Sequence, residues 1–167
     1  MVGRQGLTRD ALVGAFRAAG ADDPVSHLAT GNVSFSFPGR TRALQLRVED
    51  AIGEIIGRHE PVFIRTLGAL QRGIAAEPFS GLPYDDVCER CVSFADASPE
   101  GLLLPMTTPR GDAVVFGAGA REVFSVTRRI DGRVGNPVRL IERALGRRVT
   151  TRNWNTVERI VRLHETG

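Results

Sequence analysis

The sequence predicts an α+β fold made of two small domains, each of the ferredoxin-like (α-β plait) type. Three observations lead to this prediction. Helical and strand-like segments alternate along the whole chain of 167 residues. The second half follows the order β-α-β-β-α-β, which is the order of a plait. The first half follows α-β-β-α-β, which is the same order without its opening strand. We therefore expect the N-terminal domain to lack its first, central strand.

The N-terminal domain is expected over residues 1–80. Its predicted elements are a helix at 8–19, hairpin strands at about 25–29 and 33–37, a helix at about 40–57, a strand at 61–66 and a brief helix after Thr66. Apolar residues recur at helical spacing in the helices, and Gly20 suits the end of the first one. Gly31 and Asn32 have the chemistry of a tight turn between strands. Thr66 is a good N-cap residue.

The C-terminal domain is expected over residues 81–167, after a stretch rich in Pro and Gly at 77–83. Its predicted elements are strands at 87–95, 113–116, 122–127 and 148–152, helices at 98–105 and 137–145, and a last helix after Asn155. Asn155 is expected to cap that helix, with Glu158 at capping-box spacing. The segment 117–120 is a hairpin turn rather than a phosphate loop, because a phosphate loop joins a strand to a helix.

The composition excludes some chemistry. All 22 basic residues are Arg and there is no Lys, so Schiff-base and phosphate-loop lysines are excluded. Codon bias in a GC-rich bacterium explains this, and selection for guanidinium chemistry is the alternative. The N-terminus shows no apolar signal-peptide core, and no apolar run has the length of a membrane span. Two Cys do not make a disulfide scaffold. We expect a cytoplasmic protein with no membrane partner.

One stretch near the C-terminus is distinctive. Residues 150–157, with the sequence TTRNWNTV, closely resemble the near-C-terminal signature of the bacterial domain of unknown function 1697. Further stretches also resemble motifs of the family and follow one another in the same order as in the family. They are TGNV at 30–33, VFIRT at 62–66, PF at 78–79 and IERALG at 141–146. The resemblance implies two α-β plait domains. It implies no activity, because the family is defined by its pattern rather than its chemistry.

The chain departs from the family pattern at two places. The family usually opens with an apolar strand and a Gly-rich run, whereas here only Met1, Val2 and Gly3 remain. We expect that the natural start lies upstream; the alternatives are a second copy that pairs with the exposed N-terminal sheet edge, giving a homodimer, and a loose domain. The family also tends to carry Gly-Arg-Ser-Lys-Leu before its penultimate helix, where this chain has Gly132 to Leu140 without Ser-Lys. A phosphate site that depends on that pair does not carry over.

The best candidate site is the junction of the last strand and the last helix, where free amides and the helix dipole can hold an anion. Its candidate ligand-binding residues are Arg152, Asn153, Trp154, Asn155 and Thr156, joined by Arg139 and Arg143 from the preceding helix. The last two lie in a segment, 121–152, that has nine Arg and three acidic residues. The alternative is structural: Asn155 caps, Trp154 packs, and Arg152 pairs with an acid or a carbonyl.

No arrangement of residues indicates catalysis, so we assign no catalytic residue, cofactor or metal. The CxxC at Cys88 and Cys91 lies in a strand pattern, and the three His residues lack ligand spacing, which disfavours a redox or zinc site. The predicted function is a non-catalytic binding protein for an anionic ligand, with nucleic acid as one candidate. The alternatives are an enzyme that acts on a small phosphorylated or carboxylated metabolite between the domains, and an assembly role through an open sheet edge.

Overall fold

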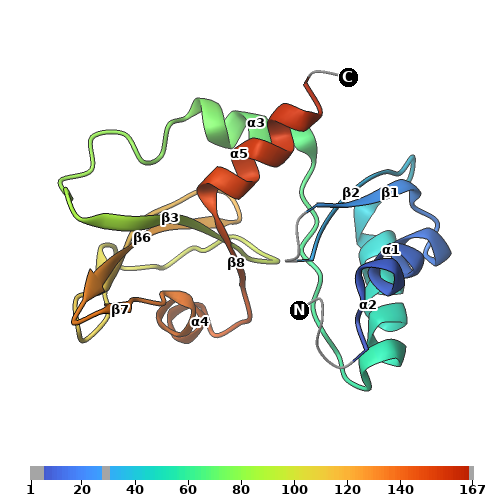
Figure 1. Cartoon of the computed structure of the whole chain (residues 1–167), viewed down its shortest axis with the longest axis horizontal. Helices are drawn as coiled ribbons and strands as arrows, with labels where there is room; N and C mark the ends of the chain where they lie inside the picture. The colour runs from blue at the N-terminus through green and yellow to red at the C-terminus, as the bar shows by residue number, and fades with distance from the viewer. Residues whose placement is uncertain (1–5, 28–30, 166–167) are drawn as a thin grey trace. The chain divides into compact units, whose positions relative to one another are not determined.

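The computed structural model describes residues 6–27 and 31–165 and is an α+β structure (Figure 1). Within these residues it has five helices, a two-stranded sheet and a six-stranded sheet. The chain divides into two compact units, Met1–Ile64 and Arg65–Gly167. This division falls earlier than the boundary at residue 80 that the sequence predicts. The reason is that the helix after Thr66 packs on the C-terminal helix and so belongs to the second unit.

The first unit packs two helices on a hairpin. Its elements are α1 (Arg9–Ala18), β1 (Asp22–His27), β2 (Asn32–Ser36) and α2 (Thr41–Ile56). Thr8 caps α1 by accepting a hydrogen bond from the Ala11 amide at 3.1 Å, and Gly57 ends α2 in the left-handed conformation. Leu12 and Phe16 of α1 and Leu44, Val48 and Ile52 of α2 form the centre of its core. Met1 to Gln5 and Leu28 to Thr30, on which the missing-strand and turn predictions partly depend, lie outside the described residues.

The segment after α2 corrects one prediction. Residues 61–66 do not pair in either described sheet, although Val62 and Ile64 pack on the core of the first unit. Instead of a ladder bond, the Val62 amide donates to Oε1 of the buried Glu49 at 2.9 Å, and Gln45 donates to the same atom. A side-chain acceptor on α2 therefore satisfies the backbone amide of Val62.

The second unit is built on an antiparallel sheet. Its elements are α3 (Leu67–Ala75), β3 (Val87–Phe94), β4 (Met106–Thr107), β5 (Ala113–Ala118), β6 (Glu122–Ile130), β7 (Arg133–Val134), α4 (Val138–Leu145), β8 (Thr150–Asn153) and α5 (Trp154–Leu163). The strand order is β4-β5-β6-β3-β8, and β7 pairs with β6. Every pairing is antiparallel. The order of β8, β3, β6 and β5 is the order that a plait requires.

One crossover differs from the prediction. The predicted helix at 98–105 is absent from the structure, and β3 connects to β5 through a loop that contains the short strand β4. Gly101 adopts a left-handed conformation with φ 82°, and Pro105 follows four residues later. The segment from Gly101 to Pro105 is only five residues long, and it begins with Gly and ends with Pro. It is therefore too short for a stable helix. The sheet thus has the strand order of a plait with only one of its two crossover helices.

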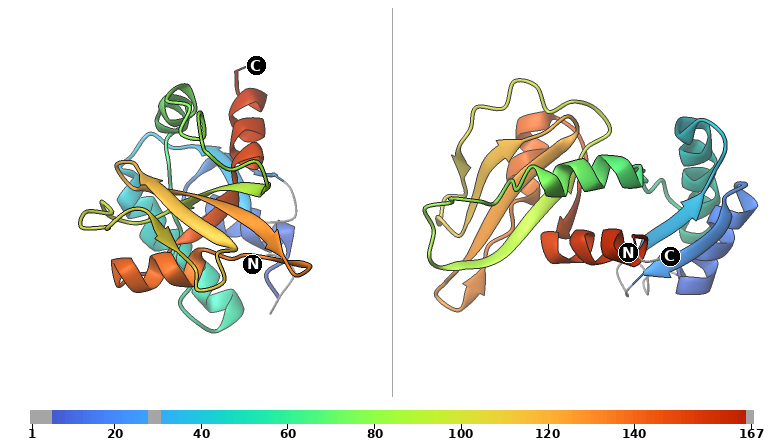
Figure 2. Two further views of the ribbon diagram at one scale, coloured as in Figure 1. Left: turned by 90° about the vertical axis from the view of Figure 1, so that its left-hand side faces the viewer. Right: turned by 90° about the horizontal axis from the view of Figure 1, so that it is seen from above.

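The two faces of this sheet bury different clusters. Val123 of β6 packs with Ala95, Val115 and Ile141, so α4 covers this face. Phe124, the next residue, points to the opposite face, because neighbouring side chains of a strand alternate. On that face Phe124 lies in register with Val92 of β3, which is in turn in register with Arg152 of β8. Helices α3 and α5 lie side by side in the same unit (Figures 1 and 2).

Gly135 precedes α4 and lies against the backbone of another segment. A Cβ at this position would overlap the carbonyl of Asp112, which also accepts a hydrogen bond from the Arg128 amide at 2.8 Å. We expect Gly135→Ala to lower the free energy of unfolding by about 1–3 kcal/mol, measured by urea denaturation. Gly14→Ala in α1, where a Cβ has open space, is the control and should leave stability equal or slightly higher. Equal stability of Gly135→Ala and the wild type would contradict this packing.

Candidate functional site

Trp154 is the centre of an aromatic cluster in the second unit. It is 4% exposed and begins α5 directly after β8. Its ring centroid lies 5.4 Å from that of Phe79 and 5.9 Å from that of Phe124. Phe79 also contacts Phe116, at 5.5 Å between centroids. Such tilted and edge-to-face contacts are favourable ring geometries. The sequence singled out Trp154 but gave no indication of its Phe partners, which lie far away in the chain.

The cap of α5 lies two residues earlier than the sequence predicts. Oδ1 of Asn153 accepts a hydrogen bond from the Asn155 amide at 3.0 Å, so Asn153 caps the helix and the predicted cap at Asn155 is wrong. The cause is that helix follows strand with no intervening loop. Asn155 is exposed, and its Oδ1 accepts from Arg90 at 2.8 Å. Glu158 lies 3.9 Å from Arg90 instead of completing a capping box. Thr156 is half-buried on α5.

Arg152 lies on β8 and is largely buried. Its Nη1 donates to Oγ1 of Thr150 at 2.7 Å and to the carbonyl of Thr151 at 2.9 Å. Burial lowers the pKa of the Arg152 guanidinium, because a low-dielectric surrounding disfavours the charged form. Arg152 thus makes two hydrogen bonds to residues of its own strand. The pairing with a carbonyl agrees with the structural role that Sequence analysis gives as the alternative.

The structure separates Arg139 and Arg143 from Trp154. Both are exposed residues of α4, which covers the Val123 face of the sheet, whereas Trp154 contacts Phe124 on the other face. The positive segment 121–152 is also partly neutralised. Its ion pairs include Arg128 with Asp86, Arg147 with Asp96, and Arg148 with Glu142. The seven predicted site residues therefore do not form one surface.

A cavity of 570 Å³ lies beside Trp154 in the second unit. The α3 side contributes Ala69, Leu70, Arg72, Gly73, Ala76 and Pro78, and the sheet side contributes Phe94, Phe116, residues 117–120, Glu122 and Phe124. Of the seven predicted residues, Trp154 alone is among these lining residues. The volume lies within the range of cavities that hold small organic ligands. The lining is mostly apolar and aromatic, with Arg72 and Glu122 as its charged side chains.

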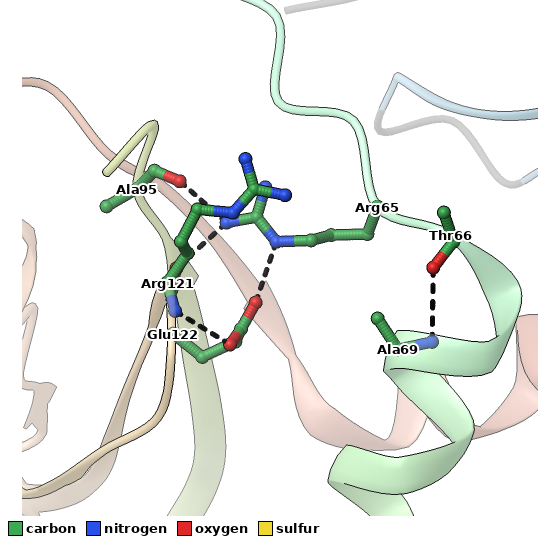
Figure 3. A network of polar contacts seen from close by, with 6 residues as sticks. All are labelled: Arg65, Thr66, Ala69, Ala95, Arg121 and Glu122. Carbon is green, nitrogen blue, oxygen red and sulfur yellow. Dashed lines mark hydrogen bonds and ion pairs between the residues drawn. The ribbon is translucent and has the colours of Figure 1, made fainter. Parts of the chain in front are cut away.

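Glu122 is already paired (Figure 3). Its Oε1 accepts a hydrogen bond from Nε of Arg65 at 2.7 Å, and its Oε2 accepts from the Arg121 amide at 3.0 Å. Nη2 of Arg65 also donates to the carbonyls of Ala95 and Arg121, at 2.6 and 2.8 Å (Figure 3). The guanidinium lies over the Phe94 ring, 5.1 Å from its centroid. Glu122 therefore contributes little free negative charge to the cavity.

Of the influences on the pKa of Arg65, burial is the largest, because the side chain is 6% exposed. It lowers the pKa of Arg65, while the hydrogen bond and the charge of Glu122 act in the opposite direction. The guanidinium stays protonated at neutral pH, as arginine does in proteins. The sequence offered one indirect signal for this residue, the Arg-Thr pair that ends the VFIRT stretch. It did not indicate a role in lining or shaping a site.

Arg72 is the second charged residue of the cavity. It is exposed on α3, and no ion pair joins it to any residue that the structure describes. A Cβ added to Gly68 would lie 3.6 Å from Nη1 of Arg72, so the guanidinium extends back along α3 by one turn. The charge balance of the lining thus consists of one neutralised carboxylate and one solvent-facing guanidinium. This balance favours an anion over a cation.

The two cysteines of the CxxC differ in environment. Cys88 is exposed, whereas Cys91 is buried, and burial together with the charge of Glu89 raises the pKa of Cys91 to about 11. Since the thiolate is the reactive form, we expect iodoacetamide at pH 8 to alkylate Cys88 alone in the native protein and both thiols in denaturant. Mass spectrometry of the alkylated peptides measures this. Equal native labelling of both sites would contradict the burial of Cys91.

Two features are absent from the described part of the chain. No helix there has the length and apolarity to cross a membrane. Across residues 6–27 and 31–165, no three His, Cys, Asp or Glu side chains come together as metal ligands would.

Comparison with known proteins gives one decisive finding. The model of a family described as a protein of unknown function, DUF1697, matches residues 1–124. The chain belongs to the DUF1697 family. The DUF1697 match includes the VFIRT and PF stretches, Glu122 and Phe124, and it ends before residues 150–157 and Trp154. Neither the curated proteins nor the solved structures gave a match.

Proposed function

We propose that this DUF1697 protein is a non-catalytic binding protein whose ligand is a small organic anion held in the cavity beside Trp154. The observation that carries the proposal is the cavity itself: 570 Å³, mainly apolar and aromatic, and charged at two side chains. A site of this kind buries most of a small ligand and orients it through a few polar groups. The strand order of the second unit supports our related proposal that this unit is a plait that lost one crossover helix.

The charges support an anion as the ligand. Arg65 neutralises Glu122 at 2.7 Å, and Arg72 is left to attract a negative group. An arginine fork can bind a carboxylate or a phosphate through two parallel hydrogen bonds. A cationic ligand would instead have to compete with Arg65 for Glu122 and would meet Arg72 at the same time.

The lining supports binding rather than catalysis. Arg72 and Glu122 are its titratable side chains, and both oxygens of Glu122 already accept hydrogen bonds. General acid–base catalysis needs a group that can reach and exchange a proton with the substrate. Nucleophilic catalysis needs an activated Ser, Cys, Lys or carboxylate, and of these the described lining holds only the engaged Glu122.

A pair of alanines on α3 allows a matched test. Ala69 lines the cavity, so Ala69→Leu should project a larger apolar side chain into the space a ligand would occupy, whereas Ala75 on the same helix is exposed and does not line it. We expect octanoate, naphthalene-2-carboxylate or benzyl phosphate, at ten times its Kd, to raise the melting temperature of the wild type and Ala75→Leu by about 3–6 °C. Ala69→Leu should show no such shift. Equal shifts in all three proteins would place binding elsewhere, and a shift with mixed-sequence RNA alone would favour a nucleic-acid partner.

A further inference from the structure

We infer that the outward face of α4 binds the phosphate backbone of double-stranded nucleic acid. The surface, which we call the α4 arginine surface, is formed by Arg139, Arg143, Arg147 and Arg148. It is separate from the cavity, because α4 lies on one side of the sheet and α3 and α5 lie on the other (Figure 1). The inference therefore goes beyond the proposed function and does not depend on it.

The first observation is the concentration of charge in residues 139–148. This segment has four Arg and one acidic residue, Glu142. The rest of the chain has 18 Arg and 18 acidic residues, so the segment accounts for the whole formal net charge of +3. A local excess of positive charge of this kind attracts a polyanion.

The second observation is the direction in which α4 presents its arginines. Ile141 is fully buried against the sheet side of the helix. Arg139 and Arg143 are four residues apart, so they lie on one side of α4, and the helical repeat places that side opposite Ile141. Both are exposed, and neither makes a hydrogen bond or an ion pair with any residue in 6–27 or 31–165. Their guanidinium groups are therefore available to a partner.

The other two arginines have weak local contacts. Arg147 lies 3.4 Å from Asp96, and Arg148 lies 3.7 Å from Glu142. Ion pairs between exposed side chains contribute little free energy, so both arginines can turn toward a phosphate at small cost. Arg139 and Arg143 are expected to make the principal contacts, with Arg147 and Arg148 adding to the positive field.

The chemistry of the surface favours a nucleic-acid duplex over other polyanions. Arginine binds phosphate through two parallel hydrogen bonds, and two arginines one turn apart on a helix suit regularly repeated phosphates. Residues 139–148 include no aromatic residue, whereas single strands are held largely by bases stacked on aromatic side chains. An anionic membrane would need large apolar side chains beside the arginines. Among the residues of α4, all of which are described, only Ala144 is both apolar and exposed.

The experiment measures the binding of a labelled duplex of about 20 base pairs by fluorescence anisotropy, with DNA and RNA of the same sequence, at about 50 and 200 mM salt. The test variant is Arg139→Gln with Arg143→Gln. The control, Arg17→Gln with Arg42→Gln, removes the same two charges from exposed residues of the first unit. Between the two salt concentrations we expect the affinity of the wild type and the control to fall about fortyfold, as about three phosphate contacts require. The test variant should bind at least about tenfold more weakly at the lower salt and lose only about fourfold on raising it.

Because both changed residues are exposed, the melting temperature of the test variant should equal that of the wild type, so that weaker binding reports the lost contacts. Equal duplex affinity of the test and control variants, or no duplex binding by the wild type at the lower salt, would overturn the inference. Tighter binding of a single strand than of the duplex would overturn the duplex assignment. Binding of phosphatidylserine vesicles or polyglutamate in place of the duplex would instead assign the surface to a membrane or an acidic protein. Tighter binding of one duplex supports the inference and identifies DNA or RNA as the source.

Discussion

Replacing Trp154 with alanine should lower the free energy of unfolding by about 3–5 kcal/mol, because the change removes a buried aromatic side chain from the core of the second unit. The indole is 4% exposed and contacts Phe79 and Phe124. It also lies under α3, so its loss should loosen the contact between that helix and α5. Urea denaturation followed by circular dichroism measures the effect.

The control for this change is Leu163→Ala on the same helix. Leu163 is 54% exposed, so its replacement should cost less than about 1 kcal/mol. A denaturation midpoint of Trp154→Ala equal to that of the wild type would show that the indole is not packed as described. The aromatic cluster would then not exist in solution.

Replacing Arg65 with alanine should also destabilise the protein, by about 3–5 kcal/mol. The Arg65 side chain is 6% exposed, and its removal takes the ion-pair partner from Glu122 and a hydrogen-bond donor from the carbonyl of Ala95. The Arg121 carbonyl also loses its bond from Arg65 but keeps the one from the Ala95 amide at 2.9 Å. Buried polar groups without partners are costly. The melting temperature and the denaturation midpoint should both fall.

A surface ion pair provides the matched control for Arg65. Arg147 pairs with Asp96 at 3.4 Å, and both side chains are largely exposed, so Arg147→Ala should change stability by about 0–1 kcal/mol. The double variant Arg65→Met with Glu122→Gln should be more stable than Arg65→Ala alone, because no unpaired charge remains. If Arg65→Ala and Arg147→Ala were equally stable, the network in Figure 3 would contribute nothing to the fold.

Local chemistry in the sequence located many of the helix boundaries. Thr66 caps α3 as predicted, Thr8 caps α1 at the start of the predicted helix at 8–19, and Gly57 and Gly146 end α2 and α4 in the left-handed conformation. These features depend on a few neighbouring residues and on backbone preference. The segment 61–66 shows the limit of such reasoning. Its β-branched pattern is real, but the segment joins neither described sheet, and Glu49 of α2 accepts the hydrogen bond from the Val62 amide.

The candidate site could be predicted only in part. Trp154 was found because an aromatic residue between a strand and a helix is conspicuous, whereas Phe79 and Phe124 reach it from distant segments. Arg139 and Arg143 were grouped with Trp154 because they are close in sequence. Which face of a sheet a helix covers is set by the path of the chain and not by local pattern. The same reason explains why Arg72, more than eighty residues before Trp154, had no visible link to the site.

The most direct test of the central claim uses the single tryptophan of the chain. Its indole N–H gives one resonance in a proton–nitrogen correlation spectrum, and Trp154 lines the cavity. On titration with naphthalene-2-carboxylate we expect this resonance to shift and saturate in the wild type and in Ala75→Leu, and to stay unchanged in Ala69→Leu. Binding detected by calorimetry without a shift of the Trp154 resonance, or an identical shift in Ala69→Leu, would contradict the claim that the ligand occupies this cavity.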